Sequence, residues 1–466
     1  MLNQVLDFLK AKIARFKATT ARKNQAFQKY ISGVDGLSNA PAIAEEKGLD
    51  AVIEFLKSRY KYFKPASIRF LISLYQYRKK LSRHMTLLSS NKKPYIIHFC
   101  VWGEKYTQRT TELLIPSLLA AQNIPLISKK YSITLLIHCD GVAKKMILNS
   151  PAGQALKEYL AIDFILIPRR LLTAFKKCQS YPEIFPFFKK LNLMNQGVKY
   201  TILGSLQTHA LELAMKNKAF VSFFMPDFLF ANGTLKKAFE EIQGKVAVVS
   251  TMYRTPFEKT LEFMSAYKKS PAVLSISSPE LTKFKIENMH LYTQKQVVSE
   301  GTDNFFPCAQ MIFKDKRGFI IRALHYHPLL VDCETISPET HVGYSTIDTC
   351  FFIDNHVVDS AEKYEDRVWV CTDSSEMAVI EISDPITTCA TDAQVNQRPI
   401  TYKRSQLLDL VVQMINSSAD AYDRPLYRYY VSHRLKVTNP SIIRAEADID
   451  DEVFLSEVYK RVNHQS

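Results

Sequence analysis

This chain of 466 residues lacks the motifs that mark several large enzyme classes. It contains no GxGxxG or GxxxxGKS/T glycine-rich loop, no HExxH zinc helix and no GxSxG nucleophile elbow. Each of these motifs supplies a local geometry that its chemistry requires. Their absence argues against the classical dinucleotide-binding, P-loop, zinc-protease and α/β-hydrolase mechanisms.

Long apolar runs and paired cysteines are also missing. No uninterrupted apolar stretch approaches the roughly 18 residues that a membrane-spanning helix needs, and charges interrupt the N-terminus every few residues. None of the eight cysteines forms a CxxC pair, and Cys100 and Cys139 lie within apolar runs. The sequence therefore predicts buried thiols in a reducing, cytoplasmic compartment, without a disulfide framework or a zinc site.

The positive charge of the chain is concentrated near its N-terminus. Residues 1–93 contain 19 Lys or Arg against 6 Asp or Glu, whereas the net charge of the whole chain is +15. The first helix of this region is amphipathic and basic, with apolar residues at helical spacing: Val5, Phe8, Leu9, Ile13 and Phe16. Such a segment suits a peripheral contact with an anionic membrane surface, a nucleic acid or an acidic partner. A helix packed on its own domain remains the alternative.

The pattern changes after residue 93, where short apolar strands begin to alternate with helices. Strands are predicted at 95–101, 131–139, 163–167, 219–225 and 246–250, with a hairpin about 314–318. This alternation predicts an α/β domain with a mostly parallel central sheet over residues 94–385. Residues 1–93 and 386–466 are predicted to be helical additions to it.

Polar residues follow several of the predicted strands. Asp140 follows 131–139, Asp227 follows 219–225, and His325 and His327 follow 319–323; Asp348 lies further along. Ligands of α/β sheets bind at the carboxyl ends of strands, so these residues are candidates for one site. Asp227 with either histidine would suit a divalent cation that bridges phosphate oxygens. The structural alternatives are a turn or helix cap for each aspartate and a hydrogen-bonded pair for the two histidines.

Two histidines lie inside the apolar strands themselves. His98 is part of the run 95–101 and His138 is part of the run 131–139. We expect both to be core histidines whose hydrogen bonds are satisfied.

In the order and spacing of short motifs, residues 94–385 resemble bacterial glycosyltransferase-like proteins of the GT-A fold, which use nucleotide-sugar donors. The resemblance rests on these motifs: Val101-Trp102-Gly103-Glu104, Leu114-Ile115-Pro116-Ser117-Leu118-Leu119, His138-Cys139-Asp140, Met225-Pro226-Asp227 with Asn232-Gly233, His325-Tyr326-His327-Pro328-Leu329 and Ser345-Thr346-Ile347-Asp348. It implies a mostly parallel sheet of the GT-A type and transfer of a sugar to an acceptor that the sequence does not identify.

The resemblance also implies roles for particular residues. An Asp-x-Asp motif in this family holds Mn²⁺ or Mg²⁺ on the diphosphate of the donor, and Asp227 occupies its first position. Leu229 stands where the second aspartate is expected, so His325 or His327 would complete the metal site.

Four further residues receive roles in the same way. Trp102 and Asp140 would line the pocket for the nucleobase and ribose, with Gly103 beside them in the donor site. Asp348 would be the base on the acceptor side.

Two functions therefore remain open at this point. The first is a metal-assisted glycosyltransferase. The second is a catalytically inactive GT-A-like module that binds a glycan, a protein or a membrane surface, which the missing second aspartate favours. A nucleic-acid partner ranks last, because no recognition motif accompanies the basic N-terminal region.

Overall fold

The computed structural model describes most of the chain between residues 91 and 464. The described residues are 77, 80–81, 91–173, 198–251, 254–299, 310–323, 326–336, 367–384, 402–419, 432–442 and 449–464. Nearly all of the predicted basic region 1–93 lies outside them, as do His325 and Asp348. The predictions made for those residues stay predictions.

The chain divides into two compact units by its internal contacts. The smaller unit consists of Met1–Thr86, Leu166–His209 and Val342–Thr346, and the larger unit holds the remainder. In the smaller unit the hydroxyl group of Tyr77 donates a hydrogen bond of 3.1 Å to the carbonyl oxygen of Leu166. The sheets described below are built almost wholly from the larger unit. The predicted boundaries at 93/94 and 385/386 stay predictions.

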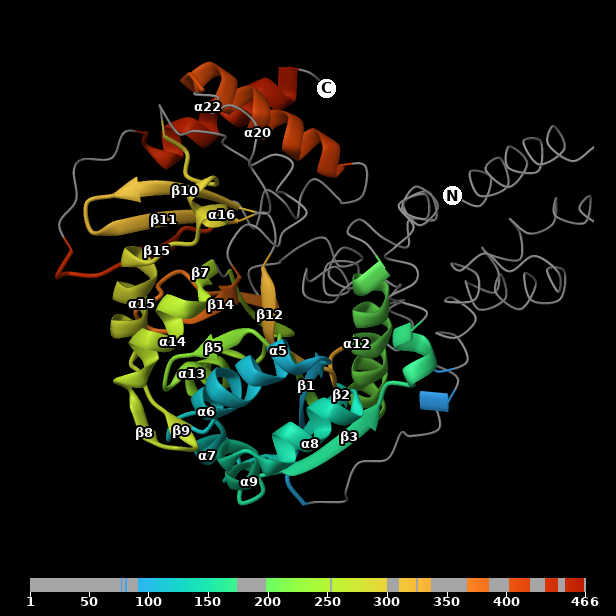
Figure 1. Ribbon diagram of the computed structural model, residues 1–466. Coiled ribbons are helices and arrows are strands. Elements are labelled where there is room, and N and C mark those ends of the chain that lie inside the picture. The colour runs from blue at the N-terminus through green and yellow to red at the C-terminus, as the bar shows by residue number, and fades with distance from the viewer. Residues whose placement is uncertain are drawn as a thin grey trace, which may run out of the picture. The chain divides into compact units, whose positions relative to one another are not determined.

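A seven-stranded sheet forms the centre of the larger unit, in the order β13-β6-β12-β4-β1-β2-β3 (Figure 1). Strand β1 is parallel to both β2 and β4, and β13 is parallel to β6, whereas β12 runs antiparallel to β4 and β6. The predicted α/β class with a mostly parallel sheet is confirmed. The strands are Pro94–Val101 (β1), Ser132–Cys139 (β2), Ala161–Leu166 (β3), Phe220–Phe223 (β4), Ala247–Ser250 (β6), His327–Asp332 (β12) and Val368–Val370 (β13).

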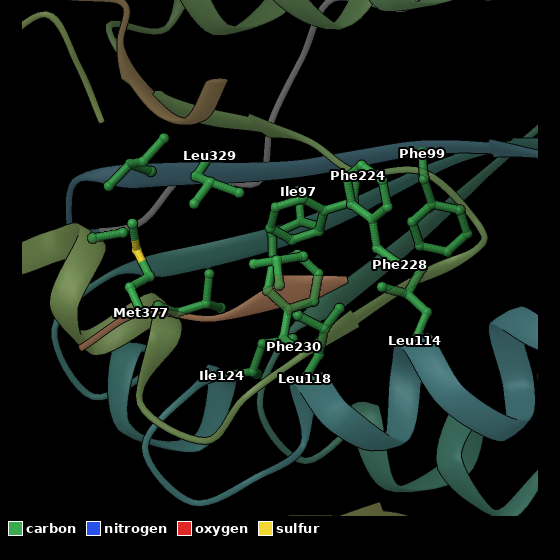
Figure 2. Packing of buried hydrophobic residues seen from close by; sticks show 14 of the residues in the cluster. Ile97, Phe99, Leu114, Leu118, Ile124, Phe224, Phe228, Phe230, Leu329 and Met377 are labelled. Atoms are coloured by element: carbon green, nitrogen blue, oxygen red, sulfur yellow. The ribbon is translucent and has the colours of Figure 1, made fainter. Parts of the chain in front are cut away.

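Helices cover the face of the sheet to which Ile97 and Phe99 belong. Both side chains are fully buried, together with Leu114 and Leu118 of the helices that follow β1. Figure 2 shows these residues around Phe230. The helical segments of this region are Glu104–Arg109 (α5), Thr110–Leu114 (η2), Ile115–Leu118 (α6), Ile124–Ile127 (α7), Gly141–Asn149 (α8), Pro151–Leu156 (α9) and Thr234–Glu241 (α13). A further helix, Val198–Lys216 (α12), begins in the smaller unit and ends in the larger one.

A smaller sheet, β5-β14-β7, lies beside this core. It comprises Phe228–Phe230 (β5), Val379–Ser383 (β14) and Arg254–Pro256 (β7). Successive side chains of a strand point to opposite faces. Accordingly Phe228 and Phe230 enter the main core, whereas Leu229 enters a second core with Ile380 and Ile382. The strand β5 is therefore buried on both faces.

A third sheet of the larger unit has the strand order β10-β11-β15. Helices α20 and α22 pack over β10 and β11 through a separate apolar cluster (Figure 1). These elements are Gln310–Asp315 (β10), Gly318–Ala323 (β11), Leu435–Thr438 (β15), Arg404–Ala419 (α20) and Asp451–His464 (α22). Between β7 and β10 lie Phe257–Ser265 (α14), Lys268–Ser270 (β8), Val273–Leu274 (β9), Ser278–Glu287 (α15) and Leu291–Gln294 (α16).

The hairpin predicted about 314–318 is confirmed by the antiparallel pairing of β10 with β11. The prediction of a wholly helical C-terminal region is wrong at β15, where Leu435 and Val437 are buried and Lys436 is exposed. This period-two alternation suits a strand with one buried face. No helix among the described residues is long and apolar enough to cross a membrane.

One buried asparagine joins several elements of the larger unit. The side-chain amide of Asn123 donates to the carbonyl oxygens of Ser117 and Ala231, each at 3.0 Å. Its Oδ1 accepts from the backbone N–H groups of Gly233 at 3.2 Å and Leu235 at 3.0 Å. Asn123 therefore fixes the predicted Asn232-Gly233 turn, which lies between β5 and α13.

We expect Asn123→Ala to lower the free energy of unfolding by about 3 kcal/mol, because four hydrogen bonds in a buried site lose their partner. Chemical denaturation followed by circular dichroism measures this loss. The exposed variant Asn149→Ala serves as the control and should change stability by no more than about 0.5 kcal/mol. Equal stability of the two variants would contradict the assignment.

Candidate functional site

The strand order of the central sheet defines where a ligand is expected. From β1 the chain continues to β2 on one side, and it later returns to form β4 on the other side. The sheet thus reverses its direction of growth between β1 and β4. In open α/β sheets, ligands bind outside the carboxyl ends of the strands at such a switch point. Trp102 and Gly103 follow β1, and Asp227 lies in the turn after β4, so they flank this position.

Gly103 is the N-cap residue of α5, and there is open space beside its backbone. Its φ of +79° falls in the region that side-chain-bearing residues rarely adopt, and a Cβ atom there would meet nothing within 4 Å. Trp102, the preceding residue, is half-buried. A ligand can therefore approach the main chain closely at this point.

The carboxylate of Asp140 joins the loops that follow β1 and β2. Its Oδ2 accepts a hydrogen bond of 3.0 Å from the backbone N–H of Gly103. Its Oδ1 accepts one of 2.7 Å from the N–H of Ala143 and caps the N-terminus of α8. The structure thus brings Asp140 and Gly103 together, and it also bears out the helix-cap alternative for Asp140.

Asp227 is half-buried in the turn between β4 and β5. Its carbonyl oxygen accepts a hydrogen bond of 2.8 Å from the N–H of Ile382 in β14. Leu229, at the position of the second expected aspartate, is fully buried in the second core. The local motif therefore provides one carboxylate, because the second position serves packing.

Tyr106 and Arg109 on α5 carry no signal in the sequence that marks them as site residues. Burial raises the pKa of the Tyr106 phenol above its ordinary value; the charge of Asp227 raises it further, and Arg109 opposes the shift. The phenol and the Asp227 carboxylate are therefore neighbours, and Tyr106 stays protonated near neutral pH. Arg109 is only 1% exposed and its guanidinium group lies 4.7 Å from the ring centre of Phe257.

Arg109 forms an ion pair with Asp384 at the end of β14. Lys105 adds a second ion pair to the same carboxylate, at 2.7 Å. The Nη1 atom of Arg109 also donates a hydrogen bond of 3.4 Å to the carbonyl oxygen of Ile382. A buried charge is costly unless it is paired, so these contacts fix the distance between α5 and β14. They also hold the Trp102–Gly103 loop, from which α5 begins.

His290 connects Asp384 to α16. Its Nδ1 accepts a hydrogen bond of 3.1 Å from the N–H of Tyr292, so Nε2 carries the proton and donates to the carbonyl oxygen of Asp384 at 2.7 Å. Burial lowers the pKa of His290. Next to it, Arg254 and Glu381 form an ion pair at 3.1 Å. The charges around the end of β14 are therefore largely paired within the protein.

His327 reaches the same edge of the sheet as Asp227, because β12 begins where the antiparallel β4 ends. It is buried, and its Nε2 donates a hydrogen bond of 2.6 Å to the carbonyl oxygen of Phe223. The imidazole also contacts the ring of Phe228 edge-on, with 5.0 Å between the ring centres. While this hydrogen bond is kept, Nδ1 is the ring nitrogen that could ligate a metal.

The described part of the chain holds one group of three side chains whose donor atoms lie close enough to share a metal ion. It consists of His98, Cys100 and His138 and includes neither Asp227 nor His327. Its three members are buried on β1 and β2. The metal role of Asp227, His325 and His327 stays a prediction.

Comparisons with known proteins found no matching family model and no matching curated protein. Among solved structures, the chain is similar to S. aureus TarS at 8% identity and a TM-score of 0.25, covering 72% of this chain and 41% of that one. It is similar to S. aureus TarS 1–349 in complex with UDP-GlcNAc at 10% identity and a TM-score of 0.26, covering 72% and 70%.

The galactosyltransferase LgtC, in complex with donor and acceptor sugar analogues, is also similar, at 11% identity and a TM-score of 0.24, covering 78% of this chain and 95% of that one. At these identities and TM-scores, the similarities carry no conclusion about this chain.

We expect Asp140→Ala to lower the free energy of unfolding by about 2 kcal/mol, because it removes a helix cap and the acceptor for Gly103. Asp140→Asn should lose about half as much, since its Oδ1 still accepts from Ala143. Thermal and chemical denaturation of both variants measure the effect. The matched control is Glu158→Ala, which changes an exposed acidic residue shortly after α9. A loss no larger than that of Glu158→Ala would show that the two loops are held by other contacts.

Proposed function

We propose that this chain is a glycosyltransferase whose nucleotide-sugar donor binds at the carboxyl ends of β4, β1 and β2. The observation that carries the proposal is the switch point between β1 and β4, with Trp102 and Gly103 on one side and Asp227 on the other. The motif resemblance of residues 94–385 to GT-A proteins supplies the class of ligand. The acceptor stays open.

Each residue at this edge has a role in the proposed donor site. The indole ring of Trp102 stacks on the nucleobase, and the open space beside Gly103 admits the ribose or a phosphate close to the main chain. Asp140 orients both loops through its two hydrogen bonds and lines the ribose pocket. The hydroxyl group of Tyr106, which stays protonated near Asp227, would contact the donor there.

A divalent cation, Mn²⁺ or Mg²⁺, fits Asp227 only as part of a shared site. Mg²⁺ in nucleotide sites is commonly held by one or two carboxylates together with the substrate phosphates, and this turn offers one. When bound, the cation would offset the negative charge that grows on the departing diphosphate. Asp227 would hold it, with His325 or His327 as a further ligand. Asp348 is the proposed base that takes the proton of the acceptor hydroxyl group.

The second candidate is a GT-A-like module that binds a donor or glycan without transferring a sugar. The burial of Leu229 at the second motif position favours it, because the carboxylate that the family uses there is replaced by a core residue. A donor that binds without being turned over would support this second function.

The decisive experiment is calorimetric titration of the full chain with UDP-sugars, with and without Mn²⁺, followed by measurement of UDP release. We expect binding of at least one donor, tighter with Mn²⁺, and slow release of UDP. Asp227→Ala should weaken binding in Mn²⁺ by about 10-fold or more, since the cation loses its protein carboxylate.

The control variant is Glu258→Ala, an exposed acidic residue at the start of α14. It should bind like the unaltered chain. No heat with any UDP-sugar would overturn the proposed donor class. Unchanged binding and turnover in Asp227→Ala would return Asp227 to the role of a turn residue.

A further inference from the structure

Three side chains that commonly ligate metals meet on one face of β1 and β2. The Nε2 atom of His98 lies 2.9 Å from the Nδ1 atom of His138 and 3.6 Å from the Sγ atom of Cys100. The three residues are at most 4% exposed. They share a face because His98 and Cys100 are two apart on β1, and His138 is the register partner of Cys100 on β2.

These distances approach those around a tetrahedral zinc ion. With Zn–N near 2.05 Å and Zn–S near 2.3 Å, tetrahedral angles place the two nitrogens about 3.3 Å apart and sulfur about 3.6 Å from nitrogen. The observed separation of sulfur and nitrogen is 3.6 Å, and that of the two nitrogens is 2.9 Å. The two imidazole nitrogens would therefore have to separate by about 0.4 Å to admit the ion, and the third pair of donor atoms, of Cys100 and His138, lies within 4.8 Å.

Burying three polar side chains at this place in the central sheet costs free energy. Strands of a parallel sheet that is covered on both faces consist mainly of Val, Ile and Leu, because their side chains are removed from water. The same face of these strands carries the fully buried Ile96 and Leu136. One bound cation could take its protein ligands from all three side chains, whose donor atoms lie within 4.8 Å of one another.

We propose that His98, Cys100 and His138 supply the three protein ligands of a site for one Zn²⁺ ion, separate from the Mn²⁺ or Mg²⁺ ion proposed at Asp227. The donor set of one thiolate and two imidazoles suits zinc, whereas Mg²⁺ and Mn²⁺ prefer oxygen ligands. On binding, Cys100 releases its proton to solvent, and the hydrogen between the two imidazoles moves to an outer ring nitrogen. The complex is then Zn²⁺ with one thiolate, two neutral imidazoles and a water molecule.

Such an ion would cross-link the two strands that lead to the donor site. Cys100 lies two residues before Trp102, and His138 lies two residues before Asp140. Bound zinc would therefore hold the ends of β1 and β2 in register and add to the hydrogen bond between Gly103 and Asp140. It would stabilise the folded chain whether or not the chain transfers a sugar, because a preformed site is absent from the unfolded state.

The test uses the full chain, produced in medium that contains either Zn²⁺ or Co²⁺, because a buried site is filled during folding. We expect about one zinc ion per purified chain after washing with a chelator, measured by elemental analysis. The cobalt form should show visible d–d bands and a near-ultraviolet charge-transfer band, which requires a thiolate ligand.

Cys100→Ala should lose the charge-transfer band and reduce the metal content by about 10-fold or more. The matched control is Cys139→Ala, which removes a buried thiol on the opposite face of β2 and should keep both signals. Metal content below about a tenth of an ion in the unaltered chain would overturn the proposal, whether or not Cys100→Ala folds. Equal charge-transfer bands in the two variants would also overturn it; the histidines would then be a hydrogen-bonded pair only.

Discussion

The parallel pairing of β1 with β2 and with β4 determines where polar side chains of this protein can gather. Because the three strands point the same way, their carboxyl ends lie along one edge of the sheet. Each strand is almost fully buried and ends at a loop, so the first polar residues after it come to that edge. Trp102, Asp140 and Asp227 therefore follow the carboxyl ends of adjacent strands, although they are far apart in the sequence.

The loops at this edge are held by charges that the protein pairs internally. Asp140 connects two loops through backbone N–H groups, and the buried ion pair of Arg109 with Asp384 fixes α5 against β14. Fixed loops lose little conformational freedom when a ligand binds, which favours affinity. In the turn after β4, Asp227 provides a single carboxylate, because Leu229 belongs to the second core. This turn provides one carboxylate where the motif resemblance implies two, and that difference keeps both candidate functions open.

The long apolar strands could be predicted from the sequence, because burial on both faces of a parallel sheet produces uninterrupted apolar runs. The short strands β5 and β14 could not, since their pairing depends on partners about 150 residues apart. Polar residues at strand ends pointed to Asp140 and Asp227. Arg109 gave no signal, because its buried ion pair joins residues that are 275 positions apart. The closeness of His98, Cys100 and His138 depends on strand register, which the sequence alone leaves open.

The central claim is that a nucleotide sugar binds at the switch point between β1 and β4. Amide hydrogen exchange of the full chain, compared with and without a UDP-sugar and Mn²⁺, tests it most directly. The account predicts slower exchange on ligand binding in residues 102–106 and 225–228, which flank that point. Unchanged exchange in both segments, with protection elsewhere in the chain or nowhere, would contradict it.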